Sequence, residues 1–222
     1  MNIAGFQKSS FVDFPGIISC VVFTPGCNMR CSYCHNKHIL SKDAPKIDNL
    51  EVMEYLNKRK GFVKGVVVTG GEPTLQPDLE AFITVLKGMG YKVKLDTNGT
   101  SPSAVKNLIE KKLIDYVAMD IKAPLEKYSA VCGCDIDTER VMQTVKLLQT
   151  AGVAHEFRTT FCPELTKEDI VRISRDITGE SDYYLQQYRQ VEGCGAPHSR
   201  EYVEDTAEAV KNGGGKCVVR GL

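Results

Sequence analysis

The sequence predicts an α/β fold in which a parallel sheet forms a partial (β/α)6 barrel, like a TIM barrel that has not closed. Short β-rich runs alternate with helical patterns, and successive strands in the middle of the chain start about 24 to 38 residues apart, the size of a βα repeat. The chain has 222 residues, whereas a closed barrel of eight units usually needs about 250. We therefore expect six units and an open barrel.

The six expected strands are rich in β-branched and aromatic residues. They begin near Ile17, Gly65, Tyr91, Asp115, Val153 and Asp182. Between them, apolar residues recur at helical spacing, as in residues 79–86. Helix start signals agree with this order, because Ser101 precedes Pro102 and Thr166 precedes two acidic residues.

The chain is expected to form a single domain over residues 1–222. Residues 1–16 form an N-terminal segment ahead of the first strand, and residues 17–190 hold the six βα units. Residues 191–222 add a C-terminal helix and an edge strand at residues 216–220.

Composition excludes several classes of protein. Lys plus Arg and Asp plus Glu each number 28, and this balance argues against an electrostatic partner such as nucleic acid or an anionic membrane. The longest nearly apolar run, residues 17–23, is too short to span a bilayer. No signal peptide is recognisable, so we expect a cytoplasmic protein, in which clustered cysteines are metal ligands more often than disulfides.

Polar side chains of the later strands are expected to point into the barrel. In residues 115–122, for example, Val117 and Met119 share the apolar face, whereas Asp120 and Lys122 share the opposite face. Helices must cover the apolar faces, so the lumen is polar. Its expected lining is Asp96, Asp120, Lys122, Glu156, Arg158 and Gln186. These residues gather near the strand ends where βα enzymes place their sites; alternatively, an open barrel simply lets water reach them.

Three cysteines follow the first expected strand with the spacing C-x3-C-x2-C. Cys27, Cys31 and Cys34 lie on a loop and can converge on one inorganic centre. In a cluster of four irons, three thiolates leave one iron open to another ligand. A closed zinc site is the alternative, with His35 or His38 as its fourth ligand.

This cysteine motif, with the aromatic Tyr33 before its last cysteine, resembles the signature of the radical S-adenosylmethionine (SAM) superfamily. Further segments resemble that superfamily in the same order along nearly the whole chain. They are Gly70-Gly71-Glu72-Pro73, Asp96-Thr97-Asn98-Gly99, Asp120-Ile121-Lys122 and Arg158. The resemblance implies a [4Fe–4S] cluster on the three cysteines, and SAM as a second cofactor.

The resemblance also implies a role for each SAM-site residue. The backbone of Gly70 and Gly71 would approach the methionine part of SAM, and Glu72 would accept from its ammonium group. Tyr33 would pack near the adenine, and Arg158 would lie near the SAM carboxylate. The rest of the expected SAM-binding set, partly shared with a nearby monovalent cation, is Asp96, Thr97, Asn98, Asp120, Lys122 and, from its place in the lumen, Gln186.

Two further segments are similar to glycyl-radical enzyme activases. Cys34-His35-Asn36 and the opening residues 5–16 resemble activases of pyruvate formate-lyase and, more closely, of anaerobic ribonucleoside-triphosphate reductase. This implies reductive cleavage of SAM to a 5′-deoxyadenosyl radical, which abstracts hydrogen from a backbone glycine of a partner enzyme. Anaerobic ribonucleotide reductase is the expected partner, and flavodoxin or ferredoxin the expected reductant.

Three alternatives compete with the activase interpretation. The chain could be a radical SAM enzyme acting on a small molecule, similar to 7-carboxy-7-deazaguanine synthase, or on a peptide. It could also be a zinc- or cluster-binding module without catalytic activity.

Six cysteines lie outside the motif. Cys20 is expected in the core. Cys132 and Cys134 form a C-x-C pair without a nearby histidine, which is an incomplete metal site, and a structural role is favoured. Cys162, at the end of the fifth expected strand, is a weaker candidate for reaching the pocket. Cys194 and Cys217 carry no motif.

Overall fold

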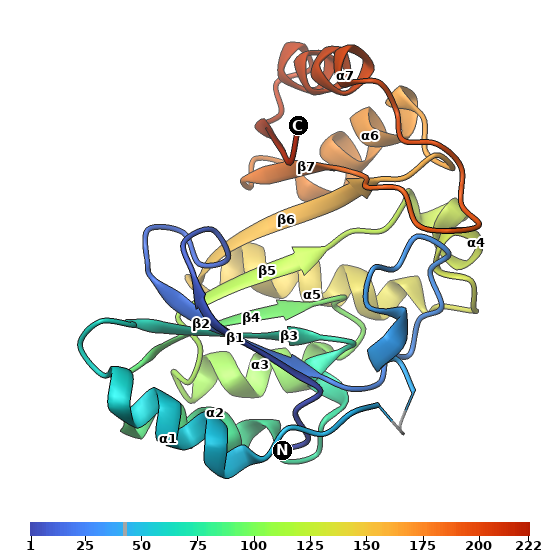
Figure 1. The fold of residues 1–222 in the computed structure, drawn as a ribbon. Coiled ribbons are helices and arrows are strands. Elements are labelled where there is room, and N and C mark those ends of the chain that lie inside the picture. Colours follow the sequence, from blue (N-terminus) through green and yellow to red (C-terminus); the bar gives the residue numbers. More distant parts are fainter. Residues whose placement is uncertain (42–43) are drawn as a thin grey trace.

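The computed structural model describes residues 1–41 and 44–222, which fold around one eight-stranded sheet (Figure 1). Its strands follow one another in chain order, and only β1 runs antiparallel to its neighbour. The strands are β1 (Gly5–Ser10), β2 (Ser19–Thr24), β3 (Gly65–Gly70), β4 (Lys92–Thr97), β5 (Tyr116–Asp120), β6 (Ala154–Phe161), β7 (Tyr183–Gln187) and β8 (Cys217–Arg220). Because β1 and β8 are the two edges of this sheet, the barrel is open, which confirms the predicted fold class.

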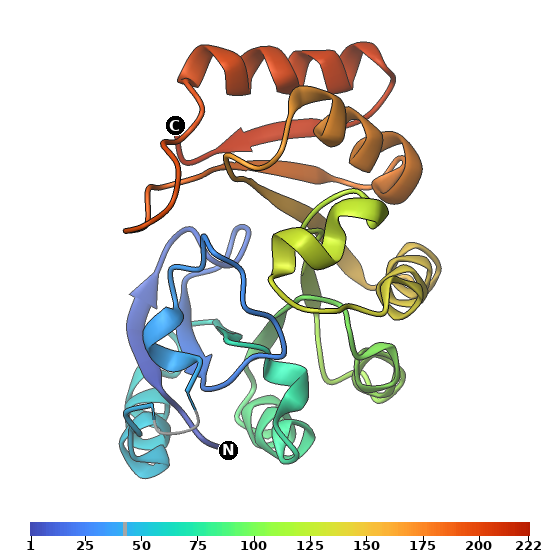
Figure 2. The same ribbon diagram turned by 90° about the vertical axis from the view of Figure 1, so that its right-hand side faces the viewer.

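Helices cover the outer face of the sheet, and the arc they form is visible in Figure 2. They are α1 (Asn49–Arg59), α2 (Leu79–Gly88), α3 (Pro102–Glu110), α4 (Tyr128–Cys132), α5 (Thr138–Thr150), α6 (Lys167–Ile173) and α7 (Arg200–Asn212). Shorter helical turns are η1 (Lys37–Ile39), η2 (Pro73–Leu75), η3 (Leu125–Lys127) and the π turn η4 (Ser174–Thr178). Within the described ranges, no helix combines the length and the apolar character needed to cross a membrane.

The six expected strands correspond to β2 through β7, and the expected edge strand is β8. The first of the six begins at Ser19 rather than near Ile17. Strand β1 was not expected, because residues 1–16 lack the alternation of apolar and polar residues that marks a half-buried strand. It pairs with β2 along its backbone, and Gly5 lies directly against the ring of Phe23.

Two apolar groups pack on opposite faces of the sheet. Val66 and Val68 are fully buried on the helix-facing side and belong to the main core. Val67, which alternates with them, packs on the other face with Val21 and with Phe14 from the β1–β2 connection. Part of the barrel interior is therefore filled by side chains, and the polar site occupies another part.

The two predicted helix starts differ in the capping hydrogen bonds that they make. Thr166 and Asp169 make both bonds of a capping box at the start of α6. Ser101 occupies the cap position before α3, but its side chain makes no capping bond.

Candidate functional site

The cysteine loop, residues 25–36, connects β2 with the η1 turn and carries the three motif cysteines. Its backbone is bonded to segments far away in the sequence. The Arg30 N–H donates to the carbonyl of Cys132 at 2.8 Å, and the Glu72 N–H donates to the carbonyl of Gly26 at 2.8 Å. These bonds hold the loop over the carboxyl ends of the strands.

Gly70 and Gly71 allow β3 to end directly against the cysteine loop. A Cβ on Gly71 would lie 1.8 Å from the carbonyl oxygen of Gly26, far inside van der Waals contact. Gly70 has a φ of +122°, and a Cβ there would lie 2.3 Å from the backbone nitrogen of Thr24. The two glycines are therefore required by the approach of two protein segments, apart from any role toward SAM.

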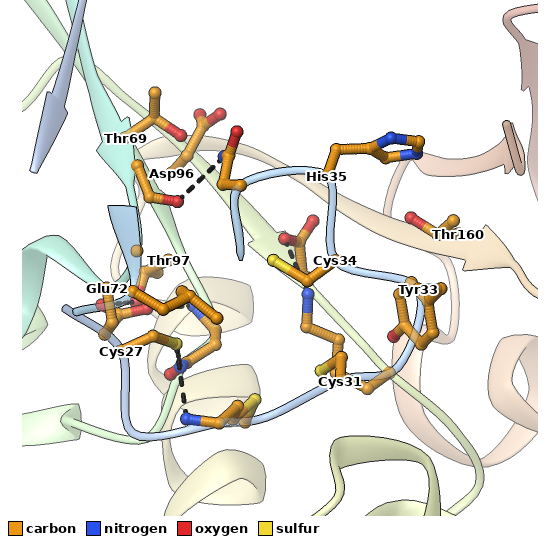
Figure 3. Close-up of a pocket in the computed structure, with 18 of the residues that line it drawn as sticks. Cys27, Cys31, Tyr33, Cys34, His35, Thr69, Glu72, Asp96, Thr97 and Thr160 are labelled. Carbon is orange, nitrogen blue, oxygen red and sulfur yellow. Dashed lines mark hydrogen bonds and ion pairs between the residues drawn. The ribbon is translucent and has the colours of Figure 1, made fainter. Parts of the chain in front are cut away.

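One cavity of about 230 Å³ lies between the cysteine loop and the strand ends (Figure 3). All the predicted site residues line it except Gln186. The lining from the predicted set is Cys27, Cys31, Tyr33, Cys34, Gly70, Gly71, Glu72, Asp96, Thr97, Asn98, Asp120, Lys122 and Arg158. The other lining residues are His35, which was the alternative zinc ligand, and Met29, Asn36, Leu40, Thr69 and Thr160.

Glu72 is only 1% exposed and its carboxylate joins the ends of β3 and β4. It accepts from the Asn98 N–H at 2.7 Å, from the Thr97 hydroxyl at 2.8 Å, and from the hydroxyl and N–H of Thr74. Burial raises the pKa of Glu72, while these donors favour the charged form. Its Oε2 atom accepts only the Asn98 bond among the described residues, so an acceptor position remains for a ligand.

Asn98 and Thr100 brace the cysteine loop from the β4 side. The Asn98 side-chain amide donates to Asn28 Oδ1 at 2.9 Å, and Asn28 in turn donates to the hydroxyl of Thr100 at 2.9 Å. Asn98 was expected to contact SAM, and its contacts here are with the loop that carries the cysteines. A second function of the D-T-N-G segment is thus to hold Cys27 in place.

Five charged side chains form a continuous ion-pair chain under the cavity. Asp96 binds Lys94 at 2.5 Å and Arg158 at 3.1 Å. Asp120 binds Arg158 at 2.9 Å and Lys122 at 3.1 Å. Burial alone would raise the carboxyl pKa of Asp120, but Arg158 and Lys122 outweigh it and lower the pKa to about 2.

Glu156 belongs to the lumen but not to the cavity. It is completely buried, and it binds Arg220 at 2.7 and 2.9 Å and the Tyr116 hydroxyl at 2.9 Å. The Arg220 guanidinium also stacks over the ring of Tyr184. This expected lumen residue therefore attaches the edge strand β8 to the barrel.

The three motif thiols differ in their surroundings. A hydrogen bond with the Cys132 thiol lowers the pKa of Cys31, whereas burial raises the pKa of Cys27 to about 11 and also raises that of Cys34. Among the described residues, no three His, Cys, Asp or Glu side chains lie close enough together to hold one metal ion. A multi-iron cluster takes each thiolate on a different iron, so this wider donor set fits a cluster better than a single zinc ion.

The two histidines that could supply a fourth zinc ligand lie in different places. His35 lines the cavity, while His38 borders a different depression beside β1. The ring of His35 lies near that of Tyr188, with 6.3 Å between centroids.

The C-x-C pair packs against the cysteine loop, which sequence reasoning missed. Cys132 is fully buried, and Cys134 Sγ lies 3.4 Å from the carbonyl oxygen of Asn28. Between them, Gly133 has a φ of +66°, and a Cβ there would lie 2.6 Å from the Arg30 carbonyl oxygen. The signal in the sequence was the glycine between the two cysteines, because a glycine allows another backbone segment to approach closely. Cys162 is fully buried and does not line the cavity.

Comparison with known proteins agrees with this geometry. Residues 21–177 match the family model of the radical SAM superfamily. A Methanocaldococcus jannaschii protein, provisionally assigned as a glycyl-radical enzyme activating enzyme, is 36% identical over 192 residues, covering 84% of this chain and 79% of that protein. A pyruvate formate-lyase-activating enzyme of Clostridium pasteurianum is 30% identical over 79% of this chain and 76% of its own length.

A more partial match is a 7-carboxy-7-deazaguanine synthase of Neisseria meningitidis, 30% identical over 52% of this chain and 50% of its own length. Among solved structures, anSMEcpe with bound AdoMet has a similar fold, with a TM-score of 0.63 and 17% identity over 89% of this chain and 61% of that chain. The superfamily match covers most of the chain, and the longer sequence matches are to activating enzymes. The chain is therefore an enzyme of the radical SAM superfamily and belongs to its family of glycyl-radical enzyme activating enzymes.

Proposed function

We propose that this enzyme generates the glycyl radical of a partner enzyme, and that the partner is an anaerobic ribonucleotide reductase. The observation that carries the proposal is the convergence of three loop thiols and a charged lumen on one cavity. A [4Fe–4S] cluster bound there would pass an electron to SAM, whose cleavage gives the 5′-deoxyadenosyl radical that removes a hydrogen atom from the substrate glycine. Flavodoxin or ferredoxin is the proposed source of the electron.

The cavity side chains suit this pair of cofactors. Cys27, Cys31 and Cys34 would hold the cluster. Arg158 uses Nε and Nη1 in its ion pairs, and among the described residues its Nη2 has no acceptor, so it can donate to the SAM carboxylate. Glu72 Oε2 can accept from the SAM ammonium group.

Tyr33 supports the adenine position in this proposal. Its side chain lines the cavity, and its hydroxyl is buried next to the Cys31 thiol. Its ring can therefore pack against an aromatic group of a ligand in the cavity. Gln186 does not line the cavity and is left out of the proposed SAM contacts.

The open barrel suits a protein substrate. The sheet ends at β1 on one side and at β8 on the other, so the lumen is not enclosed by a continuous ring of strands. A flexible loop of a partner enzyme could enter from this side and present its glycine to the cavity.

The test is electron paramagnetic resonance after anaerobic incubation of the reconstituted enzyme with SAM, reductant and candidate glycyl-radical enzymes. The expected result is a glycyl radical signal on the ribonucleotide reductase. Cys31→Ala is the control, and it should lose the iron–sulfur absorption and all cleavage of SAM. Cleavage of SAM without a signal on any candidate would refute the partner, and absence of cleavage by the reconstituted enzyme would refute the function.

A small-molecule substrate is the second candidate, because half of the chain is similar to a 7-carboxy-7-deazaguanine synthase. Mass spectrometry after incubation with pterin substrates separates the two. Formation of a deazaguanine product without any glycyl radical would replace the first proposal.

A further inference from the structure

Both oxygens of each carboxylate under the cavity are paired with a basic side chain. Asp96 receives Lys94 on Oδ1 and Arg158 on Oδ2, while Asp120 receives Arg158 on Oδ1 and Lys122 on Oδ2. These distances range from 2.5 to 3.1 Å. Each of the four carboxylate oxygens of Asp96 and Asp120 thus accepts a hydrogen bond from a cationic group.

Lys94 is the unusual member of this group of five ion-paired side chains. It lies on β4 two residues before Asp96, so both side chains point to the same face of the strand. The residue is only 2% exposed and it does not line the cavity, which places its ammonium group beneath the SAM site. A buried ammonium group needs an anionic partner. Asp96 is that partner, and its contact with Lys94 is the shortest ion pair among these five side chains.

The charges around the cavity balance without a further cation. Lys94, Arg158 and Lys122 face Asp96, Asp120 and Glu72, and the neighbouring pair of Glu156 and Arg220 is neutral. A further cation would add an uncompensated positive charge where water does not screen it well. The described residues therefore do not fit the monovalent cation that the resemblance implies near Asp96 and Asp120.

We infer that the Lys94 ammonium group takes the place of that cation in this chain, orienting Asp96 and, through it, Arg158, so that SAM binding needs neither sodium nor potassium. This inference rests on the proposed SAM site. Lys94 acts as a positioning residue, because its ammonium group contacts a cavity residue and not the cavity itself.

The first measurement is the SAM dissociation constant of the cluster-reconstituted enzyme, taken in potassium chloride, sodium chloride and choline chloride at equal ionic strength. Choline is too large to occupy a site that binds sodium or potassium. The wild-type affinity is expected to agree within about twofold among the three salts. Loss of affinity in choline chloride with recovery in potassium or sodium chloride would overturn the inference.

The second measurement uses Lys94→Met, which keeps the length of the side chain and removes its charge. SAM affinity in choline chloride should fall about tenfold or more, because one charge-assisted contact is lost, and should recover when a small cation replaces the missing charge. Lys94→Arg should remain independent of the salt. A Lys94→Met enzyme that is as independent of the salt as the wild type would refute the role of Lys94.

Lys87→Met is the matched control. Lys87 forms an ion pair of 2.7 Å with Asp115 on the helix side of the sheet, outside the lumen. The same substitution there should leave SAM binding independent of the salt. Acquired dependence in this variant would show that the effect is not specific to the lumen and would count against the inference.

Thallium-205 NMR of the wild-type enzyme without SAM tests independently whether a monovalent cation binds. This test remains decisive if Lys94→Met fails to fold. Thallium(I) substitutes for potassium, and no saturable millimolar binding is expected. Saturable binding would overturn the inference even if SAM binds. Absence of SAM binding in every salt would instead refute the proposed function, and the thallium titration would still test the cation site.

Discussion

At the scale of the residue, Gly71 determines whether the cysteine loop can lie against β3. The absent Cβ leaves room for the carbonyl oxygen of Gly26, and the Glu72 N–H next to it donates to the same oxygen. A methyl group at this point must displace backbone, which cannot move aside as a flexible side chain can.

Gly71→Ala is therefore expected to displace the cysteine loop. The variant should fold but retain less than about half of the iron and sulfide of the reconstituted wild type, because three ligands on a displaced loop no longer converge. Iron and sulfide analysis after anaerobic reconstitution measures this.

Gly88→Ala is the control for that substitution. Gly88 is the last residue of α2, and a Cβ there meets no atom within 4 Å. This change should leave the iron content unchanged and should stabilise the protein slightly, by about 0.5 kcal/mol. Equal iron content in the two variants would remove the structural role assigned to Gly71.

Cysteine spacing and strand alternation pointed to a part of the residues that line the cavity. This part is Cys27, Cys31, Cys34, Asp96, Asp120, Lys122 and Arg158, whereas Gly70, Gly71, Glu72, Thr97 and Asn98 came from the resemblance to a family. The contacts of Cys132 and Cys134 with the cysteine loop could not be predicted, because they depend on how a loop about a hundred residues later in the chain folds back. Gln186 shows the limit of strand parity, which gives the face of a residue but not its depth in the barrel.

At the scale of the element, α6 begins with a complete capping box and α3 does not. Thr166→Ala should lower the stability by about 1 kcal/mol, since it leaves the Asp169 N–H without its side-chain acceptor. For a chain of this size the melting temperature should fall by about 2 to 4 °C.

Ser101→Ala provides the comparison for the capping prediction. Ser101 holds the same position before α3, and its side chain makes no capping bond. Its substitution should change the melting temperature by less than about 1 °C. Similar losses in both variants, measured by differential scanning calorimetry, would contradict the assignment of the stability to the Thr166 cap.

The edge strand β8 depends on the pair of Glu156 and Arg220. Arg220→Met would leave a fully buried carboxylate with only the Tyr116 hydroxyl as a partner. Breaking a buried pair costs about 3 to 5 kcal/mol, and because the Arg220 side chain is 34% exposed we expect about 2 kcal/mol. The melting temperature should fall by about 4 to 8 °C.

Lys216→Met is the matched change for Arg220→Met, immediately before the same strand. Lys216 pairs with Asp182 at 3.6 Å, and both side chains are mostly exposed, so the stability should change by no more than about 0.5 kcal/mol. If Arg220→Met melts at the same temperature as Lys216→Met, the buried pair does not stabilise β8.

Among the described strands, only β1 was not predicted, and for a physical reason. β1 is stabilised by backbone pairing with β2, and Gln7, Lys8 and Ser9 are all exposed. An edge strand with no buried alternate face has no apolar period to detect. The later strands are covered by helices, so each has an apolar face, and the resulting sequence pattern made these strands predictable.

At the scale of the whole molecule, length favoured an open barrel. A chain of 222 residues is shorter than the about 250 that eight units usually need, and the structure leaves the sheet open between β1 and β8. The total charge of the chain, with 28 basic and 28 acidic residues, does not reveal the ion pairs of the lumen, where Lys94, Arg158 and Lys122 bind Asp96 and Asp120. Total charge therefore argued against some classes of partner but gave no information about the site.

The contacts of the cysteine loop also constrain the biogenesis of the enzyme. Ser32 is bonded to Glu164 and to Cys194, which lie 132 and 162 residues further along the chain, so the loop has its full support only after these segments have left the ribosome. Until then the three thiols belong to an unfinished loop on a nascent chain. A cofactor inserted before residue 194 has been synthesised would therefore meet a loop that lacks both of these bonds.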